Sequence, residues 1–241
     1  MDALTALFWG AFSSASLFIG AWMAGPMAKA HRLTGLIMGF GAGTLLSAVA
    51  YELVPESSLG NGPGFAFGFA AGALTYFVGD HLVDKSGGAD RVDIDPDTQG
   101  SGMAMFLGAL LDGIPEAFIL GLTIASGGAI SVAFLTAVFV SNIPQGLAGT
   151  VSLKTAGYRD RSVWRMWTLL TVAAALASLV GYLAGDLVPH QGIYAEAFAG
   201  GAVLTMLADS MMPEAFEHGG RLVGLVTVLG YLVAATLTVF D

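Results

Sequence analysis

The 241-residue chain is strongly apolar: 55% of its residues are hydrophobic, 11% are charged, and the mean hydropathy is +0.74. Soluble domains carry about 25% charged residues, so this composition excludes an ordinary soluble domain and indicates an integral membrane protein in a lipid bilayer. The net charge of −9 says little about partners, since the acids lie in connections and spans, and we expect no nucleic acid among them. Without cysteine, the chain has neither a disulfide framework nor a thiolate metal site.

Eight apolar windows are each long enough to cross a hydrocarbon core, which takes about 20 helical residues. In chain order, we expect spans at residues 4–24, 34–54, 64–83, 102–124, 128–151, 164–184, 192–212 and 220–239. They leave no room for a soluble domain, so residues 1–241 are expected to form a single all-α transmembrane domain. The first window follows MDAL, which lacks the basic residues of a cleavable signal peptide, so we expect it to stay as a helix.

The basic residues all fall in alternate connections between the expected spans or within two residues of them: Lys29, Arg32, Lys85, Arg91, Lys154, Arg159, Arg161, Arg165 and Arg221. Lys and Arg accumulate on the cytoplasmic side of a membrane. We therefore expect a multi-pass protein of the cytoplasmic (inner) membrane with both termini outside. One of its cytoplasmic connections, about residues 84–101, is acidic and is expected to be a solvated loop.

The second and seventh spans end in similar motifs, YELVPES and LADSMMPEAFEHGG. Each places a Pro-Glu pair, Pro55-Glu56 or Pro213-Glu214, at the end of an apolar run. Under the expected topology the two motifs leave the membrane on opposite sides, as in an inverted repeat of spans 1–3 and 6–8 around spans 4 and 5. The alternative is that prolines and acids simply favour helix ends.

The fourth span contains two carboxylates in LLDGIPEAFILG. Asp112 and Glu116 are four residues apart, so they project from one helix face near the middle of the span. A charge at that depth costs about 3 kcal/mol on insertion scales, which excludes exposure to lipid. Pro115 has no N–H, so it leaves the carbonyl of Leu111 without its helical partner beside Asp112.

The fifth span repeats this arrangement in VSNIPQGLAG. Ser141 and Gln145 share one helix face, Asn142 lies beside them, and Pro144 frees the carbonyl of Val140. We therefore expect both helices to be interrupted at about the same depth and to enclose an oxygen-rich pocket. Such a pocket favours a metal cation, with Asp112, Glu116, Ser141, Asn142 and Gln145 as ligands. The alternatives are protonated acids hydrogen-bonded inside a kinked bundle, or a proton relay.

These motifs resemble the ZIP family of divalent metal transporters, in its compact bacterial form. That family has eight spans and external termini, and its fourth and fifth helices carry His-Asn-x-Pro-Glu-Gly and related motifs that supply the transport-site ligands. DGIPEA and SNIPQG occupy those places here, and GFGAGTLLSAVAYELVPES and LADSMMPEAFEHG also read like the family. The resemblance covers nearly the whole chain and implies transport of a divalent cation, with Zn²⁺ as the first candidate.

In the fourth span, the resemblance sets Asp112 where a histidine is usual, Gly113 in place of an asparagine, and Glu116 on the usual glutamate. The two carboxylates remain, but the imidazole ligand is absent.

In the fifth span, Ser141 stands where a histidine or a longer polar ligand is common, Asn142 matches the asparagine, and Gln145 replaces a glutamate. The resulting oxygen-only set suits Mn²⁺ or Fe²⁺ at least as well as Zn²⁺. There are two alternatives to a carrier: a cation or proton channel, and a ZIP-like protein that no longer transports.

Four residues outside these two spans are weaker candidates for metal contact: Glu52, Asp209, Glu214 and His218. The last two could line an exit path. An enzyme is not expected, because the only imaginable aspartate pair, Asp80 and Asp112, lies at two different depths, and no serine–histidine pair lies within the spans. We expect the metal as substrate and no organic cofactor; the sequence leaves a homodimer open.

Overall fold

The computed structural model describes residues 3–27, 30–54, 63–85, 102–125, 132–187 and 192–238. Within these ranges every regular element is a helix, which confirms the predicted all-α class. The predicted acidic connection falls almost wholly outside the described residues, which stop at Lys85 and resume at Gly102. Pro55 and Glu56 also lie outside them.

The helices follow the predicted spans closely. Their bounds are α1 (Ala3–Met27), α2 (His31–Ala48), η1 (Val49–Leu53), α4 (Pro63–Val83), α5 (Gly102–Ala125), α6 (Val132–Thr155), α7 (Asp160–Leu187), α8 (Gly192–Met206), η3 (Leu207–Met211), α9 (Met212–Gly219) and α10 (Leu222–Thr238). The fifth span, predicted at residues 128–151, begins and ends about one turn later as α6, and the seventh, predicted at 192–212, continues to Gly219. Hydrophobic periodicity places helix ends only to within a few residues.

Six helical segments of the described chain are long and apolar enough to cross a membrane: those beginning at Ala3, His31, Pro63, Phe106, Val132 and Asp160. The apolar helix α10 is shorter, with 17 residues. The seventh predicted span is divided, because the π-helical segment η3 separates α8 from α9. These findings support a multi-pass membrane protein.

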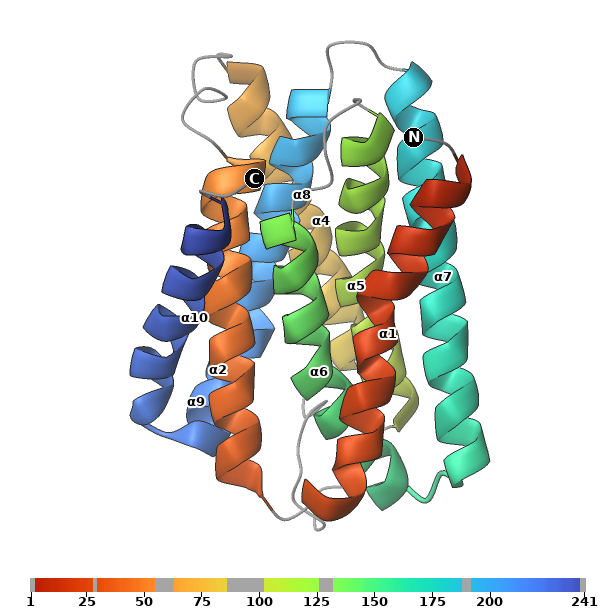
Figure 1. Ribbon diagram of the computed structural model, residues 1–241, viewed down its shortest axis with the longest axis vertical. Helices are drawn as coiled ribbons and strands as arrows, with labels where there is room; N and C mark the ends of the chain where they lie inside the picture. Colours follow the sequence, from red (N-terminus) through yellow and green to blue (C-terminus); the bar gives the residue numbers. More distant parts are fainter. Residues whose placement is uncertain are drawn as a thin grey trace.

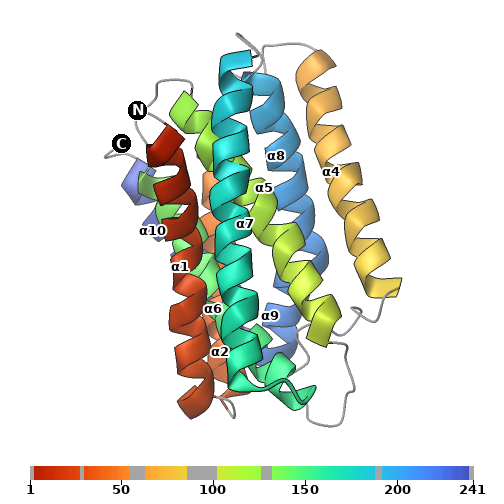
Figure 2. The ribbon, with the colours of Figure 1, turned by 90° about the vertical axis from the view of Figure 1, so that its right-hand side faces the viewer.

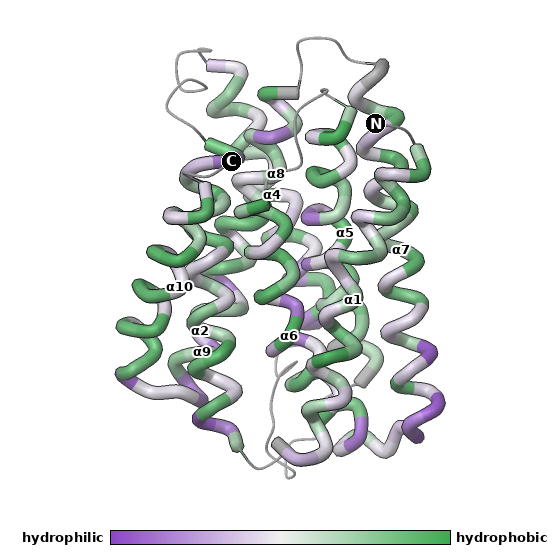
Figure 3. The backbone as a smooth tube through the Cα atoms, in the orientation of Figure 1, coloured by the Kyte–Doolittle hydropathy of each residue, from purple (hydrophilic) through white to green (hydrophobic). Residues whose placement is uncertain are grey.

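Successive long helices run in alternating directions through the bundle (Figures 1 and 2). The beginning of α1 and the end of α10 lie toward one end, as an even number of crossings requires. The turn from α6 to α7 lies at the other end, where Lys154 and Asp160 form an ion pair of 2.9 Å. Figure 3 shows apolar residues along most of each helix and hydrophilic ones at the start of α7. The described basic residues therefore gather at the end of the bundle opposite the termini.

Four pairs of helices make the most extensive contacts: α5 with α7, α1 with α6, α2 with α10, and α4 with α8. Small residues permit these close approaches, as at Gly121, where a Cβ atom would overlap the backbone carbonyl of Ser178. The largest apolar core cluster includes Leu45, Ile119 and Val203 from three different helices. This core surrounds α5 and α6, which carry the predicted polar residues.

The prolines of the predicted site do not interrupt their helices. α5 continues through Pro115 and α6 continues through Pro144, so the expected interruption at these positions is wrong. Neighbouring helices in a bundle hold a proline-containing helix together by packing. Instead, the regular α-helical hydrogen bonding changes in the second and seventh spans, where η1 and η3 are π-helical. π-Helical turns often mark functional sites.

Candidate metal site

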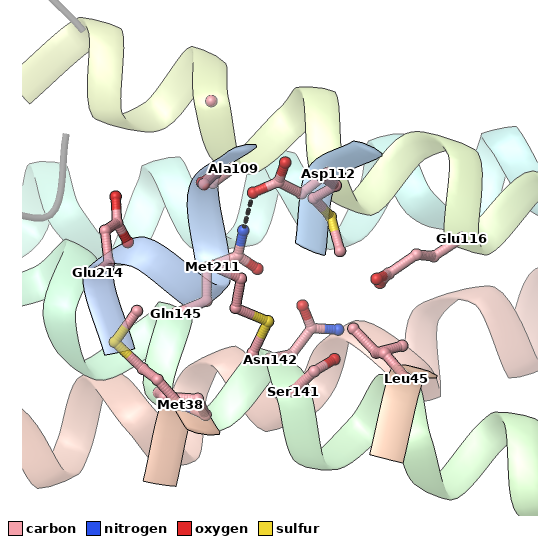
Figure 4. Close-up of a pocket in the computed structure, with 14 residues that line it drawn as sticks. Met38, Leu45, Ala109, Asp112, Glu116, Ser141, Asn142, Gln145, Met211 and Glu214 are labelled. Atoms are coloured by element: carbon pink, nitrogen blue, oxygen red, sulfur yellow. Dashed lines mark hydrogen bonds between the residues drawn. The ribbon is translucent and has the colours of Figure 1, made fainter. Parts of the chain in front are cut away.

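A small cavity of about 50 Å³ lies between α2, α5, α6 and the η3–α9 segment (Figure 4). All five residues of the predicted ligand set contribute to its lining: Asp112, Glu116, Ser141, Asn142 and Gln145. On this measure a water molecule needs about 10–15 Å³, so the cavity has room for an ion that keeps a few of its waters. The helical periodicity of α5 and α6 turns these side chains toward the same space.

Asp112 accepts hydrogen bonds from two different helices. The Tyr76 hydroxyl on α4 donates to Asp112 Oδ1 at 2.6 Å, and Gln145 Nε2 on α6 donates to Asp112 Oδ2 at 2.8 Å. Figure 4 shows the second of these contacts as a dashed line across the cavity. The two hydrogen bonds fix the orientation of the Asp112 carboxylate. Gln145 uses its amide nitrogen in this contact and not its carbonyl oxygen.

Glu116 is the most deeply buried carboxylate of the cavity, with 3% of its surface exposed. Figure 4 shows its carboxylate pointing into the space in front of Asn142. Within the described residues, this side chain has no hydrogen-bond or ion-pair partner. Asp112 lies one turn away and repels it electrostatically. A buried carboxylate with a second one beside it requires a cation or a proton to balance the charge.

Neutral oxygens from α6 face the two carboxylates. Asn142 Nδ2 donates to the carbonyl of Ser13 on α1 at 3.3 Å, which commits the amide nitrogen and orients the side chain. The hydroxyl of Ser141 donates to the carbonyl of Val138 at 2.9 Å. Both groups are buried, and both retain oxygen lone pairs that can bind a cation. The wall formed by α5 and α6 thus combines two carboxylates with amide and hydroxyl oxygens.

The weaker candidates of the seventh span separate into different places. Glu214 lines the cavity at its α9 side. Asp209 is exposed and is not part of the lining. His218 lies one turn beyond Glu214, and its ring is 6.3 Å from that of His31 at the start of α2. His31 is therefore brought beside a predicted exit-path residue.

Glu52 lies in a second cavity rather than in the first. That space, of about 170 Å³, is also lined by Glu196 of α8 and by Ile119, Leu120 and Phe134. The last three belong to the apolar core cluster. Glu52 is therefore separated from the predicted ligand set.

Sequence reasoning found no signal for Tyr76, which contacts a cavity residue, or for the methionines that line the cavity. Tyr76 is buried, with 2% exposed, and reaches Asp112 from 36 positions away along the chain. Met38, Met206 and Met211 line the cavity opposite the α5–α6 oxygens. An apolar residue in an apolar span carries no mark of a polar function, so only the packing of the helices identifies them.

Comparison with known proteins gives one distant relative. A protein of Arabidopsis thaliana named "Putative zinc transporter" is 24% identical to the chain over 214 residues, which are 86% of the chain and 34% of that protein. The chain thus spans about a third of the length of this relative. No family model matches the chain. This sequence similarity suggests metal transport and does not depend on the geometry of the cavity.

Proposed function

We propose that this protein is a ZIP-like carrier that moves divalent transition-metal ions across the cytoplasmic membrane, most readily Zn²⁺ and in the direction of uptake. The observation that carries the proposal is Glu116, a buried carboxylate directed into a small cavity that it shares with Asp112. A divalent cation balances both charges, and Asn142, Gln145 and Ser141 complete an oxygen coordination shell. The distant relative named as a zinc transporter points to the same substrate class.

The proposed topology has eight membrane crossings with both termini outside. Its support is the gathering of the described basic residues at the end of the bundle opposite the two chain ends (Figure 1). Lys and Arg are retained on the cytoplasmic side. The cavity extends to Glu214 on α9, which lies toward this same end, and we propose that the ion leaves the cavity in this direction.

An inverted repeat is part of the proposal, and reciprocal glycine contacts support it. A Cβ atom on Gly43 of α2 would overlap the carbonyl of Thr227 on α10, and one on Gly201 of α8 would overlap the carbonyl of Phe69 on α4. Gly43 and Gly201 are 158 positions apart, and so are Phe69 and Thr227. The contact between α2 and α10 therefore has a counterpart between α8 and α4.

A second pair of glycine contacts shows the same offset of 158 positions. A Cβ atom on Gly230 would overlap the carbonyl of Phe40, and one on Gly72 would overlap the carbonyl of Phe198. These pairs are again related by 158 positions, as are the first residues of η1 and η3. Equivalent helices run in opposite directions (Figures 1 and 2). Two inverted halves around one site are a frequent basis of alternating access.

Uptake of Zn²⁺ into liposomes containing the purified protein tests the function. We expect saturable uptake in the wild type and at least about a tenfold loss in Glu116→Gln and in Asp112→Asn, because each leaves one anion against two positive charges. Asp160→Asn is the matched control: it also removes a carboxylate, but one in an exposed ion pair, and should transport normally.

Three outcomes separate the proposal from its alternatives. Normal uptake by both cavity variants would contradict the metal site. Flux that does not saturate, with single-channel currents, would indicate a channel instead of a carrier. Metal retained by the purified wild type without any uptake would indicate a ZIP-like protein that binds but does not transport.

A further inference from the structure

Three methionine side chains line the candidate metal cavity: Met38 of α2, Met206 at the end of α8, and Met211 at the end of η3. Met38 and Met206 are each 4% exposed, so they are buried at this place and not turned to lipid. Oxygen ligands come from α5 and α6, whereas the thioethers come from α2 and the α8–η3 segment. A cation in the cavity would therefore have oxygens on one side and sulfur on the other.

The sulfur of Met211 is directed into the cavity. Figure 4 shows the Met211 side chain extending between Gln145 and the pair formed by Ser141 and Asn142, while Met38 lies on the side of Glu214. These are the residues that provide the neutral oxygens of the proposed coordination shell. The thioether thus lies among the candidate ligands themselves.

The absence of a side chain at Gly41 makes this position of Met211 available. A Cβ atom on residue 41 would lie 2.9 Å from Ser141 Cα and 3.1 Å from Met211 Cε. Both distances are too short for ordinary packing. Only a glycine at position 41 therefore allows α2 to lie this close to α6 and to Met211. The Met211 methyl group and Ser141 therefore both lie close to residue 41 of α2.

The π-helical segment η3 determines where two of the sulfurs point. The N–H of Met212 donates to the carbonyl of Leu207, an i→i+5 contact. With that hydrogen bonding, residues five apart lie nearly above one another, whereas in an α-helix of 3.6 residues per turn they are about 140° apart. Met206 and Met211 are five positions apart. An uninterrupted α-helix would turn one of them away from the cavity.

We propose that this cavity selects soft and borderline metal ions, such as Zn²⁺, Cd²⁺ and Cu⁺, over hard ions such as Mn²⁺ and Mg²⁺. Met211 is the main residue that provides this selectivity, and Met38 and Met206 contribute to it. Thioether sulfur binds soft cations and contributes little to hard ones, which prefer carboxylate and carbonyl oxygens. The oxygen-only set inferred from the sequence suits Mn²⁺ or Fe²⁺ at least as well as Zn²⁺; the methionines reverse that expectation. This inference rests on the proposed metal site.

X-ray absorption at the cadmium edge of the Cd²⁺-loaded protein tests the inference directly. The chain contains no cysteine, so any sulfur in the first coordination shell must come from methionine. We expect a sulfur contribution in the wild type that is lost or reduced in Met211→Leu. A shell of oxygen and nitrogen alone in the wild type would overturn the inference.

Competition between Cd²⁺ and Mn²⁺ for the purified protein gives the second measurement. Leucine has nearly the volume of methionine, so the exchange preserves packing while removing the sulfur. We expect Met211→Leu to lower the affinity for Cd²⁺ about tenfold and to leave that for Mn²⁺ unchanged, with a smaller loss in Met38→Leu. Two controls lie outside the cavity lining and should keep the wild-type ratio: Met212→Leu and Met166→Leu.

The outcomes distinguish this inference from the function on which it rests. A wild type that binds neither Cd²⁺ nor Mn²⁺ would contradict the metal site itself. A wild type that binds both, with a Cd²⁺ to Mn²⁺ affinity ratio unchanged in Met211→Leu and Met38→Leu, would leave the site intact and refute selection by thioether sulfur.

Discussion

Gln145 Nε2 donates a hydrogen bond to Asp112 Oδ2 at 2.8 Å, and this contact joins α6 to α5 across the cavity. An amide is well suited to this position in the absence of metal, because its N–H satisfies the carboxylate while its carbonyl oxygen remains a neutral ligand. The two residues are therefore joined directly to each other and, by the proposed function, also bind the ion.

Gln145→Glu should make the stability of the protein depend on metal. The substitution replaces an amide donor with a carboxylate next to Asp112 Oδ2, so the empty cavity gains a repulsive contact. A divalent cation removes that repulsion. We expect a lower melting temperature than wild type without metal, a larger increase on adding Zn²⁺, and slower release of the ion. Equal Zn²⁺-induced shifts in the two proteins would show that residue 145 does not face the ion.

Tyr76→Phe should weaken metal uptake without unfolding the protein. The change removes only the hydroxyl that donates to Asp112 Oδ1 at 2.6 Å, and a hydrogen bond to a charged group contributes about 1.5–3 kcal/mol. We expect a rise in the apparent KM for Zn²⁺ of about tenfold, with little change in the maximal rate. The control is Tyr51→Phe, an exposed tyrosine whose ring is tilted by 47° against that of Tyr231. Identical KM values in both variants would exclude Tyr76 from positioning Asp112.

Gly43→Ala and Gly201→Ala should destabilise the protein by similar amounts. In each case the new Cβ atom would overlap a backbone carbonyl of the neighbouring helix, Thr227 or Phe69, and backbone yields less than a side chain. We expect a loss of about 1–3 kcal/mol for each, measured by thermal unfolding in detergent. Gly25→Ala serves as control because no atom lies within 4 Å of the added Cβ. A large loss in only one variant would contradict the equivalence of the two contacts.

Cysteine labelling from each side of the membrane should establish the topology. Because the chain has no native cysteine, single introduced cysteines report without background. Thr155→Cys, an exposed position at the basic end of the bundle, should react only from the cytoplasmic side. Ser57→Cys, between η1 and α4, should react only from outside. Reaction of both from one face would contradict the eight-span topology.

The helices and the first part of the site could be predicted from local patterns. Long apolar runs identify membrane helices because a hydrocarbon core requires each segment to satisfy its own backbone hydrogen bonds. The spacing of Asp112 and Glu116 placed both carboxylates on one face, since helical periodicity is set by the backbone alone. The five predicted ligands line one cavity; that they bind metal remains a proposal.

Prediction from local patterns was wrong where neighbouring helices determine the outcome. Pro115 and Pro144 were expected to interrupt α5 and α6, but both helices continue through them. Departures from α-helical hydrogen bonding include η1 and η3, which no sequence signal had indicated. The number of crossings also stays a prediction, because six described segments meet the length and hydropathy of a span and the seventh predicted span is divided by η3.

The amino-acid pattern alone was enough to predict an all-helical membrane protein with a pair of carboxylates inside its fourth apolar span. Only the tertiary structure showed that Tyr76 orients Asp112 and that Met211 faces the same cavity. Both contacts join segments far apart along the chain, and neither residue differs in type from those that pack the rest of the bundle. Their functions depend on which helices lie side by side and on the π-helical turn of η3, and those features arise from packing over the whole molecule.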